Sequence, residues 1–173
     1  MNYNKINTAD IANGKGVRVS LFVSGCTLRC PGCFNPQAQK FDYGNEYTKR
    51  IETDLLYALA QPYISGLSIL GGEPYDQDPD DLLSLVEKMK YLYPNKDIWI
   101  WTGHEFEEIR NHPLTKYIDV AICGRFEVGQ RDITFNNRFR GSSNQRVIDV
   151  KESLKTGKLV GLPDIPNNEI KEN

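Results

Sequence analysis

Long hydrophobic runs, a basic excess and a dense cysteine framework are all missing from this sequence of 173 residues. No stretch approaches the ~20 apolar residues that a membrane-spanning helix needs. The first ten residues, MNYNKINTAD, lack the apolar core of a signal peptide. Lys and Arg number 21 and Asp and Glu number 23, so the formal net charge of −2 is not that of a dedicated nucleic-acid binder. We therefore expect a cytoplasmic protein that binds neither membranes nor nucleic acids.

The length of the chain favours one domain. It is short for a complete eight-fold β/α barrel, which usually needs about 250 residues. The segment 163–173, PDIPNNEIKEN, has few large apolar residues, and such a composition is typical of a loose chain end. We expect a single domain over residues 1–162, followed by a flexible C-terminal tail.

Hydrophobic periodicity alternates between that of strands and that of helices. Expected strands cover residues 17–24, 66–70, 97–102, 118–123 and 146–150, and expected helices cover 46–60, 79–93 and 105–111. The second helix should begin at Pro79 with Asp78 as its N-cap, because proline suits the first helical position. Strands and helices that alternate through short loops predict right-handed crossovers and a mainly parallel sheet, hence an α/β fold.

Four of the expected strands are followed by segments that suggest chemistry. A cysteine-bearing loop follows the first strand, GGEP the second, TGH the third and CGRF the fourth. Parallel α/β folds place their functional residues at the carboxyl ends of the strands. We therefore expect these four segments to meet on one rim of the sheet.

Three of the four cysteines lie close together in the sequence. Cys26, Cys30 and Cys33 form the spacing C-x3-C-x2-C, whereas Cys123 lies much later in the chain. Clustered thiols in a reducing compartment favour a metal site over a disulfide framework. A ferredoxin-type [4Fe–4S] cluster and a structural zinc each usually take four protein ligands. Three local cysteines thus leave one metal position open, where a substrate can bind directly.

Less specific interpretations of the cysteines stay open at this point. A structural metal completed by Cys123, His104 or His112 is one, and a merely buried set of cysteines is another. A non-catalytic iron–sulfur electron carrier and a zinc-stabilised module are the corresponding functions. His104 receives no role, because a lone histidine is more often structural than catalytic.

Several segments together resemble a known family: NGKGVRVSLFVSGC at 13–26, CPGCFN at 30–35, WTG at 101–103 and FRGSSNQR at 139–146. The cysteine spacing after one strand and GGEP after the next resemble the radical S-adenosylmethionine (SAM) superfamily. Within it, the chain is similar to the activating proteins of anaerobic ribonucleoside-triphosphate reductase from about Tyr3 to about Asp149. It departs from them at Lys15, where relatives tend to have proline, and at Cys123, where they tend to have an acidic residue.

The resemblance implies an incomplete TIM-type β/α barrel with the radical SAM core, and a [4Fe–4S] cluster on Cys26, Cys30 and Cys33. The fourth iron would bind the amino and carboxylate groups of SAM. The residues implied in SAM binding are Gly32, Cys33, Phe34, Gly71, Gly72, Glu73 and Thr102. Among them, Glu73 would accept from the amino group and Phe34 would form an apolar wall beside the adenine. No catalytic side chain is implied beyond the cluster and SAM.

The resemblance also implies a reaction and its partners. The chain would be a radical SAM oxidoreductase that cleaves SAM reductively and forms a 5′-deoxyadenosyl radical. This radical would take a hydrogen atom from a glycine on a loop of the large anaerobic reductase, leaving a glycyl radical. A low-potential donor such as flavodoxin or ferredoxin would supply the electron. Another radical SAM activity, such as activation of pyruvate formate-lyase, is the nearest alternative.

A group of arginines lies in the last third of the chain, comprising Arg125, Arg131, Arg138, Arg140 and Arg146. A solvated face and a nucleic-acid patch are two interpretations, and the second lacks the broad basic excess it requires. We favour a surface that docks to the reductase, shared with the neighbouring GSSNQR segment.

Overall fold

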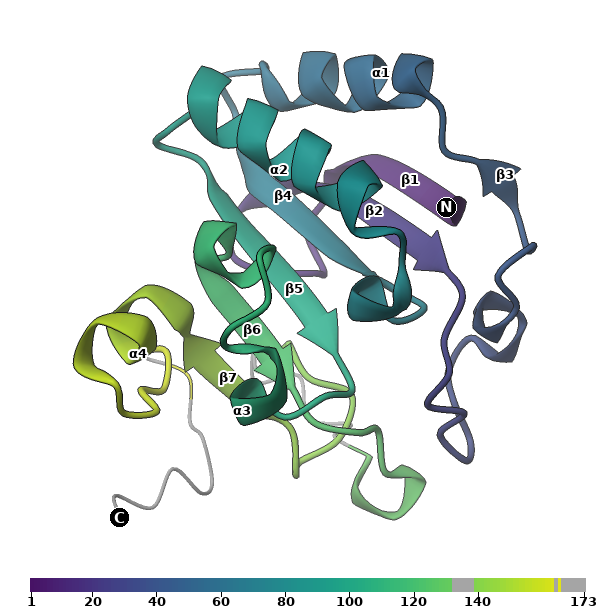
Figure 1. Ribbon diagram of the computed structural model, residues 1–173, viewed down its shortest axis with the longest axis vertical. Coiled ribbons are helices and arrows are strands. Elements are labelled where there is room, and N and C mark those ends of the chain that lie inside the picture. Colours follow the sequence, from purple (N-terminus) through teal and green to yellow (C-terminus); the bar gives the residue numbers. More distant parts are fainter. Residues whose placement is uncertain (132–138, 164, 166–173) are drawn as a thin grey trace.

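A seven-stranded mixed sheet organises the chain in the computed structural model, which describes residues 1–131, 139–163 and 165. The strands are β1 (Asn2–Asp10), β2 (Val17–Ser24), β3 (Asn45–Glu46), β4 (Ile64–Gly71), β5 (Asp97–Thr102), β6 (Val120–Cys123) and β7 (Arg146–Asp149). Their order across the sheet is β3-β1-β2-β4-β5-β6-β7. β2, β4, β5 and β6 run parallel, and the strands beside this central group pair antiparallel (Figure 1).

The prediction of an α/β fold with a parallel centre is confirmed, and β2 and β5 have the predicted bounds. β1 was not predicted, because its sequence NYNKINTAD is largely polar and most of its residues are only half-buried. Backbone pairing with β2 holds this strand in place instead. The order ends at β3 on one side and at β7 on the other, so the sheet is open.

Helices α1 (Lys49–Leu59), α2 (Pro79–Leu92) and α3 (Phe106–Ile109) connect the parallel strands, and α4 (Val150–Thr156) follows β7. The predicted start of α2 is confirmed: the Asp78 side chain accepts from the amide of Asp80, and Pro79 occupies the first turn. α4 was not predicted. It is capped at its C-terminal end by Gly157, which adopts the left-handed conformation that glycine tolerates best. Among the described residues, no helix is both long and apolar enough to cross a bilayer.

The two faces of the sheet are packed differently. Val19, Leu21 and Val23 of β2 point into a large apolar core beneath α1 and α2, which lie across one face of the sheet (Figure 1). The alternating positions of the strands face the other way, where Trp99 and Ile122 anchor a smaller cluster. This second face carries the cavity described below.

Polar contacts of Arg18 in β2 link neighbouring strands on the face of the sheet opposite to α1 and α2. The buried guanidinium of Arg18 forms a 2.6 Å ion pair with Asp97 and donates to the hydroxyl of Ser68 at 2.7 Å. It also lies over the ring of Trp99, 5.3 Å from the centroid. Burial lowers the pKa of Arg18, and Asp97 acts against this effect. The predicted tail, 163–173, lies mainly outside the described residues, and its residue Ile165 is buried in the smaller cluster.

Candidate functional site

A cavity of about 490 Å³ opens at the carboxyl ends of the parallel strands. This volume lies in the range typical of small-molecule sites, about 300–1,000 Å³. It contains the three clustered cysteines and six of the seven residues predicted to bind SAM. Those six are Cys33, Phe34, Gly71, Gly72, Glu73 and Thr102. The structure thus brings the cysteine loop, the GGEP turn and the end of β5 to one place.

Cys26, Cys30 and Cys33 are half-exposed free thiols on the cavity wall. Burial raises the pKa of Cys26, and the backbone amides of Leu28 and Arg29 act against this effect. Within the described residues, no three His, Cys, Asp or Glu side chains are grouped tightly enough to hold a single metal ion. In a four-iron cluster each cysteine binds a different iron. The three thiols on the cavity wall could each hold one iron of such a cluster.

Gly32 is the one predicted SAM contact outside the cavity lining. It is exposed, and its φ of +69° is a conformation that side chains rarely adopt. A Cβ added there would lie 3.0 Å from the side chain of Val128. Gly32 therefore shapes the turn between two cysteines and lies against the segment after β6.

The two glycines of GGEP let this turn pack directly on the backbone that leads to Cys26. A Cβ on Gly71 would lie 2.7 Å from the carbonyl oxygen of Val23, and one on Gly72 would lie 2.3 Å from that of Gly25. The amide of Gly72 donates to Val23 at 2.7 Å, and that of Glu73 donates to Gly25 at 2.8 Å. Close approach of two backbones thus explains both glycines.

Glu73 lines the cavity and is buried, with 1% of the residue exposed. Its Oε1 accepts from the hydroxyl of Thr102 at 2.8 Å and from the amide of Tyr75 at 3.1 Å. Its Oε2 accepts from the amide of Gly103 at 2.8 Å. Burial raises the pKa of Glu73, and these hydrogen bonds act against it. Since a carboxylate has about four acceptor positions, one on Oε2 has no donor among the residues that the structure describes.

Asp76 and Gln77, which follow the GGEP turn, form hydrogen bonds to the cysteine loop. Neither residue was predicted from the sequence. Asp76 Oδ2 accepts from the amide and from the hydroxyl of Thr27, at 2.7 and 2.8 Å. Gln77 Nε2 donates to the carbonyl oxygens of Gly25 and Glu73, at 3.0 and 2.8 Å. Thr27 directly follows Cys26, so these contacts orient the first predicted ligand. No spacing or periodicity in the sequence signals such cross-loop contacts.

The FRGSSNQR segment forms the far wall of the cavity. Gln145 Oε1 accepts from the amides of Gly141 and Ser142, at 2.8 and 3.2 Å, and its Nε2 donates to Gly124 at 2.8 Å. Arg140 is buried and also lines the cavity. The motif was noticed in the sequence, but its position in the cavity wall was not predicted.

The arginines of the last third of the chain do not form one exposed group. Arg140 is buried, and Arg146 forms ion pairs with two glutamates of the segment around α3. Arg125 and Arg131 are exposed, and Arg131 lies over the ring of Phe34, 4.8 Å from its centroid. Arg138 lies outside the described residues. Docking of this region to a reductase stays a prediction.

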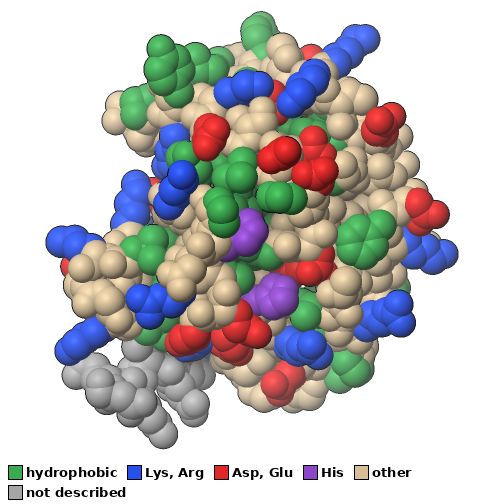
Figure 2. Space-filling model, in the orientation of Figure 1, with side chains coloured by type: hydrophobic (Ala, Val, Ile, Leu, Met, Phe, Trp, Pro, Cys, Tyr) green, Lys and Arg blue, Asp and Glu red, His purple; other side chains and the backbone are tan. Residues whose placement is uncertain are grey.

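The cavity lining, as far as the chain is described, does not include Cys123 or either histidine. Cys123 is fully buried in the helix-covered core, on the opposite face of the sheet, and burial raises its pKa. His104 lies 3.8 Å from a carboxylate oxygen of Asp76, and His112 contacts the ring of Tyr75 edge-on. Figure 2 shows both histidines at the surface of the helix-covered face, and one of them beside acidic side chains. Among the described residues, none of the three lines the cavity, so the geometry does not favour them as a fourth ligand.

Comparison with known proteins supports an iron–sulfur site. The sequence model of the 4Fe-4S single cluster domain family matches residues 12–148. The chain is 40% identical over 148 residues to the anaerobic ribonucleoside-triphosphate reductase-activating protein of Enterobacteria phage T4, covering 85% of this chain and 93% of the relative. It is 38% identical over 152 residues to the protein of that name from Escherichia coli K12, covering 85% and 97% of the two chains. A third relative of that name, from Vibrio cholerae, is 38% identical over 150 residues, covering 84% and 96%.

Proposed function

This chain belongs to the family of anaerobic ribonucleoside-triphosphate reductase-activating proteins, and we propose that it activates such a reductase by radical SAM chemistry. The single observation that carries the proposal is that one cavity contains the three cysteines, the GGEP turn and Thr102. An electron carrier needs no cavity of ligand size beside its cluster. A zinc-stabilised module would usually surround its metal with four protein ligands.

The chain's own residues fit a cluster and SAM. Cys26, Cys30 and Cys33 would hold a [4Fe–4S] cluster as thiolates, leaving one iron without a protein ligand. When bound, such a cluster supplies the electron that cleaves the S–C5′ bond of SAM, which yields methionine and the radical that removes a hydrogen atom from a glycine of the reductase. The sheet would form the partial barrel of a radical SAM core.

The remaining residues position SAM for this step. The free acceptor position on Glu73 fits one N–H of the SAM amino group, and burial makes this hydrogen bond stronger than it would be in water. Thr102 holds the Glu73 carboxylate in place at 2.8 Å. Phe34 offers an apolar surface beside Cys33, suited to an adenine ring. Holding the reacting groups together in this way supplies the proximity that the reaction needs.

Anaerobic reconstitution with iron and sulfide tests the proposal. We expect four irons per chain, an EPR signal that changes when SAM is added, and 5′-deoxyadenosine after reduction. Incubation with an anaerobic ribonucleotide reductase should then give the doublet of a glycyl radical. Alanine variants of Cys26, Cys30 and Cys33 should each lose the cluster, while Cys123→Ala should keep it. A cluster that is indifferent to SAM would contradict the proposal and favour an electron carrier.

A further inference from the structure

His104 lies in the turn between β5 and α3, and the function proposed above gives it no role. Hydrogen bonds fix its backbone on both sides. Its amide donates to the hydroxyl of Thr102 at 3.1 Å, and its carbonyl accepts from the amide of Gly124 at 3.0 Å. The side chain is 27% exposed. The end of β5 and the segment after β6 therefore set the place from which the imidazole ring projects.

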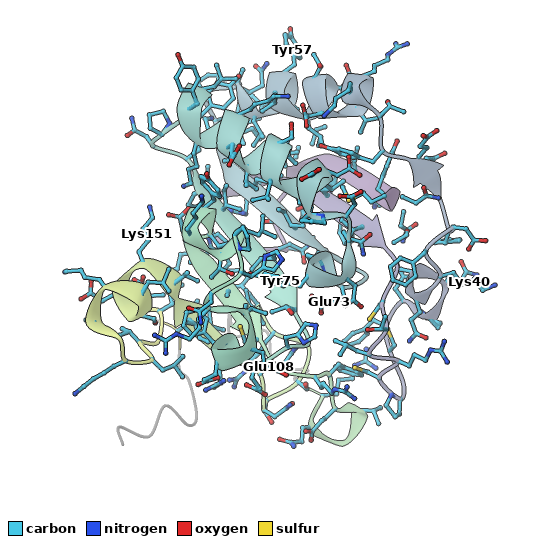
Figure 3. All side chains as sticks on the ribbon, in the orientation of Figure 1. Lys40, Tyr57, Glu73, Tyr75, Glu108 and Lys151 are labelled. Carbon is cyan, nitrogen blue, oxygen red and sulfur yellow. The ribbon has the colours of Figure 1, made fainter. Side chains whose placement is uncertain are left out.

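Acidic side chains face the ring of His104 from two other segments. Its Nε2 lies 3.8 Å from Oδ1 of Asp76, and its Nδ1 lies 3.8 Å from Oε2 of Glu108. The carboxylate of Glu73 also interacts electrostatically with the ring. Figure 3 shows Glu73 and Glu108 toward the same end of the sheet. A neutral imidazole carries one N–H and the charged form carries two, so the charged form suits a ring whose two nitrogens each face a carboxylate.

Other contacts hold both neighbouring carboxylates in place. Oε2 of Glu108 accepts from the amide of Glu105 at 2.7 Å, as part of the capping box of α3. The amide of Asp76 donates to the carbonyl of Glu73 at 3.1 Å, and the Asp76 side chain is 14% exposed. The space between the two carboxylates therefore does not depend on His104 for its shape.

Asp76 connects this histidine to the cysteine loop. Its Oδ1 faces His104, whereas its Oδ2 accepts from the amide and the hydroxyl of Thr27, at 2.7 and 2.8 Å. Thr27 directly follows Cys26. A charge on His104 therefore acts on the same carboxylate that orients the first predicted cluster ligand.

We propose that His104, in its charged form, is a positioning residue that holds the Asp76 carboxylate against Thr27 and so fixes the cysteine loop. Loss of a ring proton removes the ion pair and leaves Asp76 freer to turn away from the loop. Since histidine changes its charge between pH 5 and 8, the loop should open more readily as pH rises through this range. The inference rests on the proposed function in one respect, because that function assigns a cluster to this loop.

Hydrogen exchange of the cysteine loop tests the assignment, because it measures local opening. Mass spectrometry follows the peptide that contains Thr27 in reconstituted holoprotein, and rates are corrected for the intrinsic effect of pH. From about pH 6 to about pH 8 we expect protection of the unmodified protein to fall about five-fold, as for a weak, partly exposed ion pair. His104→Lys stays charged and should be protected at both pH values. His104→Gln carries no charge and should be weakly protected at both.

Two further variants complete the experiment. His112→Gln, at the other histidine of the chain, is the matched control and should keep the pH dependence of the unmodified protein. Asp76→Asn retains an oxygen acceptor for Thr27 but loses the charge that His104 faces, so its protection should not change with pH. This variant gives the answer even where a change at His104 prevents folding.

Iron release to a chelator provides a second measurement on the same loop. It should be about five-fold faster in His104→Gln than in His104→Lys, as for the same partly exposed ion pair. Equal protection in these two variants would overturn the proposal, as would a pH dependence that persists in His104→Gln or in Asp76→Asn. A cluster that is indifferent to SAM would instead overturn the proposed function, and it would leave the protection of the loop unchanged.

Discussion

The hydroxyl of Thr102 donates a 2.8 Å hydrogen bond to the carboxylate of Glu73 and so joins the end of β5 to the turn after β4. Both side chains are almost fully buried. The same carboxylate accepts a 2.8 Å hydrogen bond from the amide of Gly103. The position of the GGEP turn in the cavity therefore depends on the neighbouring strand as well as on its own glycines.

Replacement of Thr102 by valine should weaken this connection. The variant keeps the shape of the side chain but leaves a buried carboxylate with one donor fewer, which costs about 1–3 kcal/mol. Chemical denaturation of the cluster-free protein measures the loss. Thr102→Ser is the matched control, because it retains the hydroxyl and should stay within about 1 kcal/mol of the unmodified protein. Equal losses in both variants would show that the hydrogen bond is not the cause.

The stability of the protein should depend on pH through Glu73. Burial raises the pKa of this carboxyl above its ordinary value of 4.5, so the folded protein holds the proton more tightly than the unfolded chain. Its contribution to stability therefore falls as pH rises from about 4.5 through the raised pKa. Urea unfolding of the unmodified protein and of Glu73→Gln, which does not titrate, should show profiles that diverge over this window. Parallel profiles would contradict the prediction.

Gly72→Ala should damage the site much more than alanine at an exposed glycine with free space around it. The new Cβ would lie 2.3 Å from the carbonyl oxygen of Gly25, so the backbone before Cys26 must shift. We expect a loss of at least about 2 kcal/mol in stability, as for other overpacked sites, and lower iron retention after reconstitution. At Gly129, a Cβ meets nothing within 4 Å, so Gly129→Ala is the matched control. Normal iron retention in Gly72→Ala would refute the close-approach argument.

The four cysteines should differ in their reactivity toward an alkylating reagent. Cys26, Cys30 and Cys33 are half-exposed, whereas Cys123 is buried on the far face of the sheet and its raised pKa keeps it protonated. Mass spectrometry of the folded, cluster-free protein should detect three alkylated sites, and a fourth only after unfolding. Alkylation of Cys123 at the rate of the other three would place it in the cavity and reopen its role as a ligand.

The sequence by itself determined those features that depend on local patterns. Alternating apolar residues predicted β2, and a short apolar run predicted β5, both with their observed bounds. Asp78 and Pro79 predicted the start of α2, since capping chemistry acts within one turn. The C-x3-C-x2-C spacing and GGEP predicted which residues meet, because the carboxyl ends of parallel strands share one edge.

The tertiary structure alone decided what depends on contacts between distant segments. Periodicity shows that Cys123 alternates with its neighbours in β6, but only the packing of the helices shows that it faces the core and not the cavity. β1 escaped prediction because its stability comes from pairing with β2 and not from its own composition. The hydrogen bonds of Asp76 and Gln77 to the cysteine loop join residues whose separation along the chain carries no signal. Side-chain chemistry between such segments exists only once the fold has brought them together.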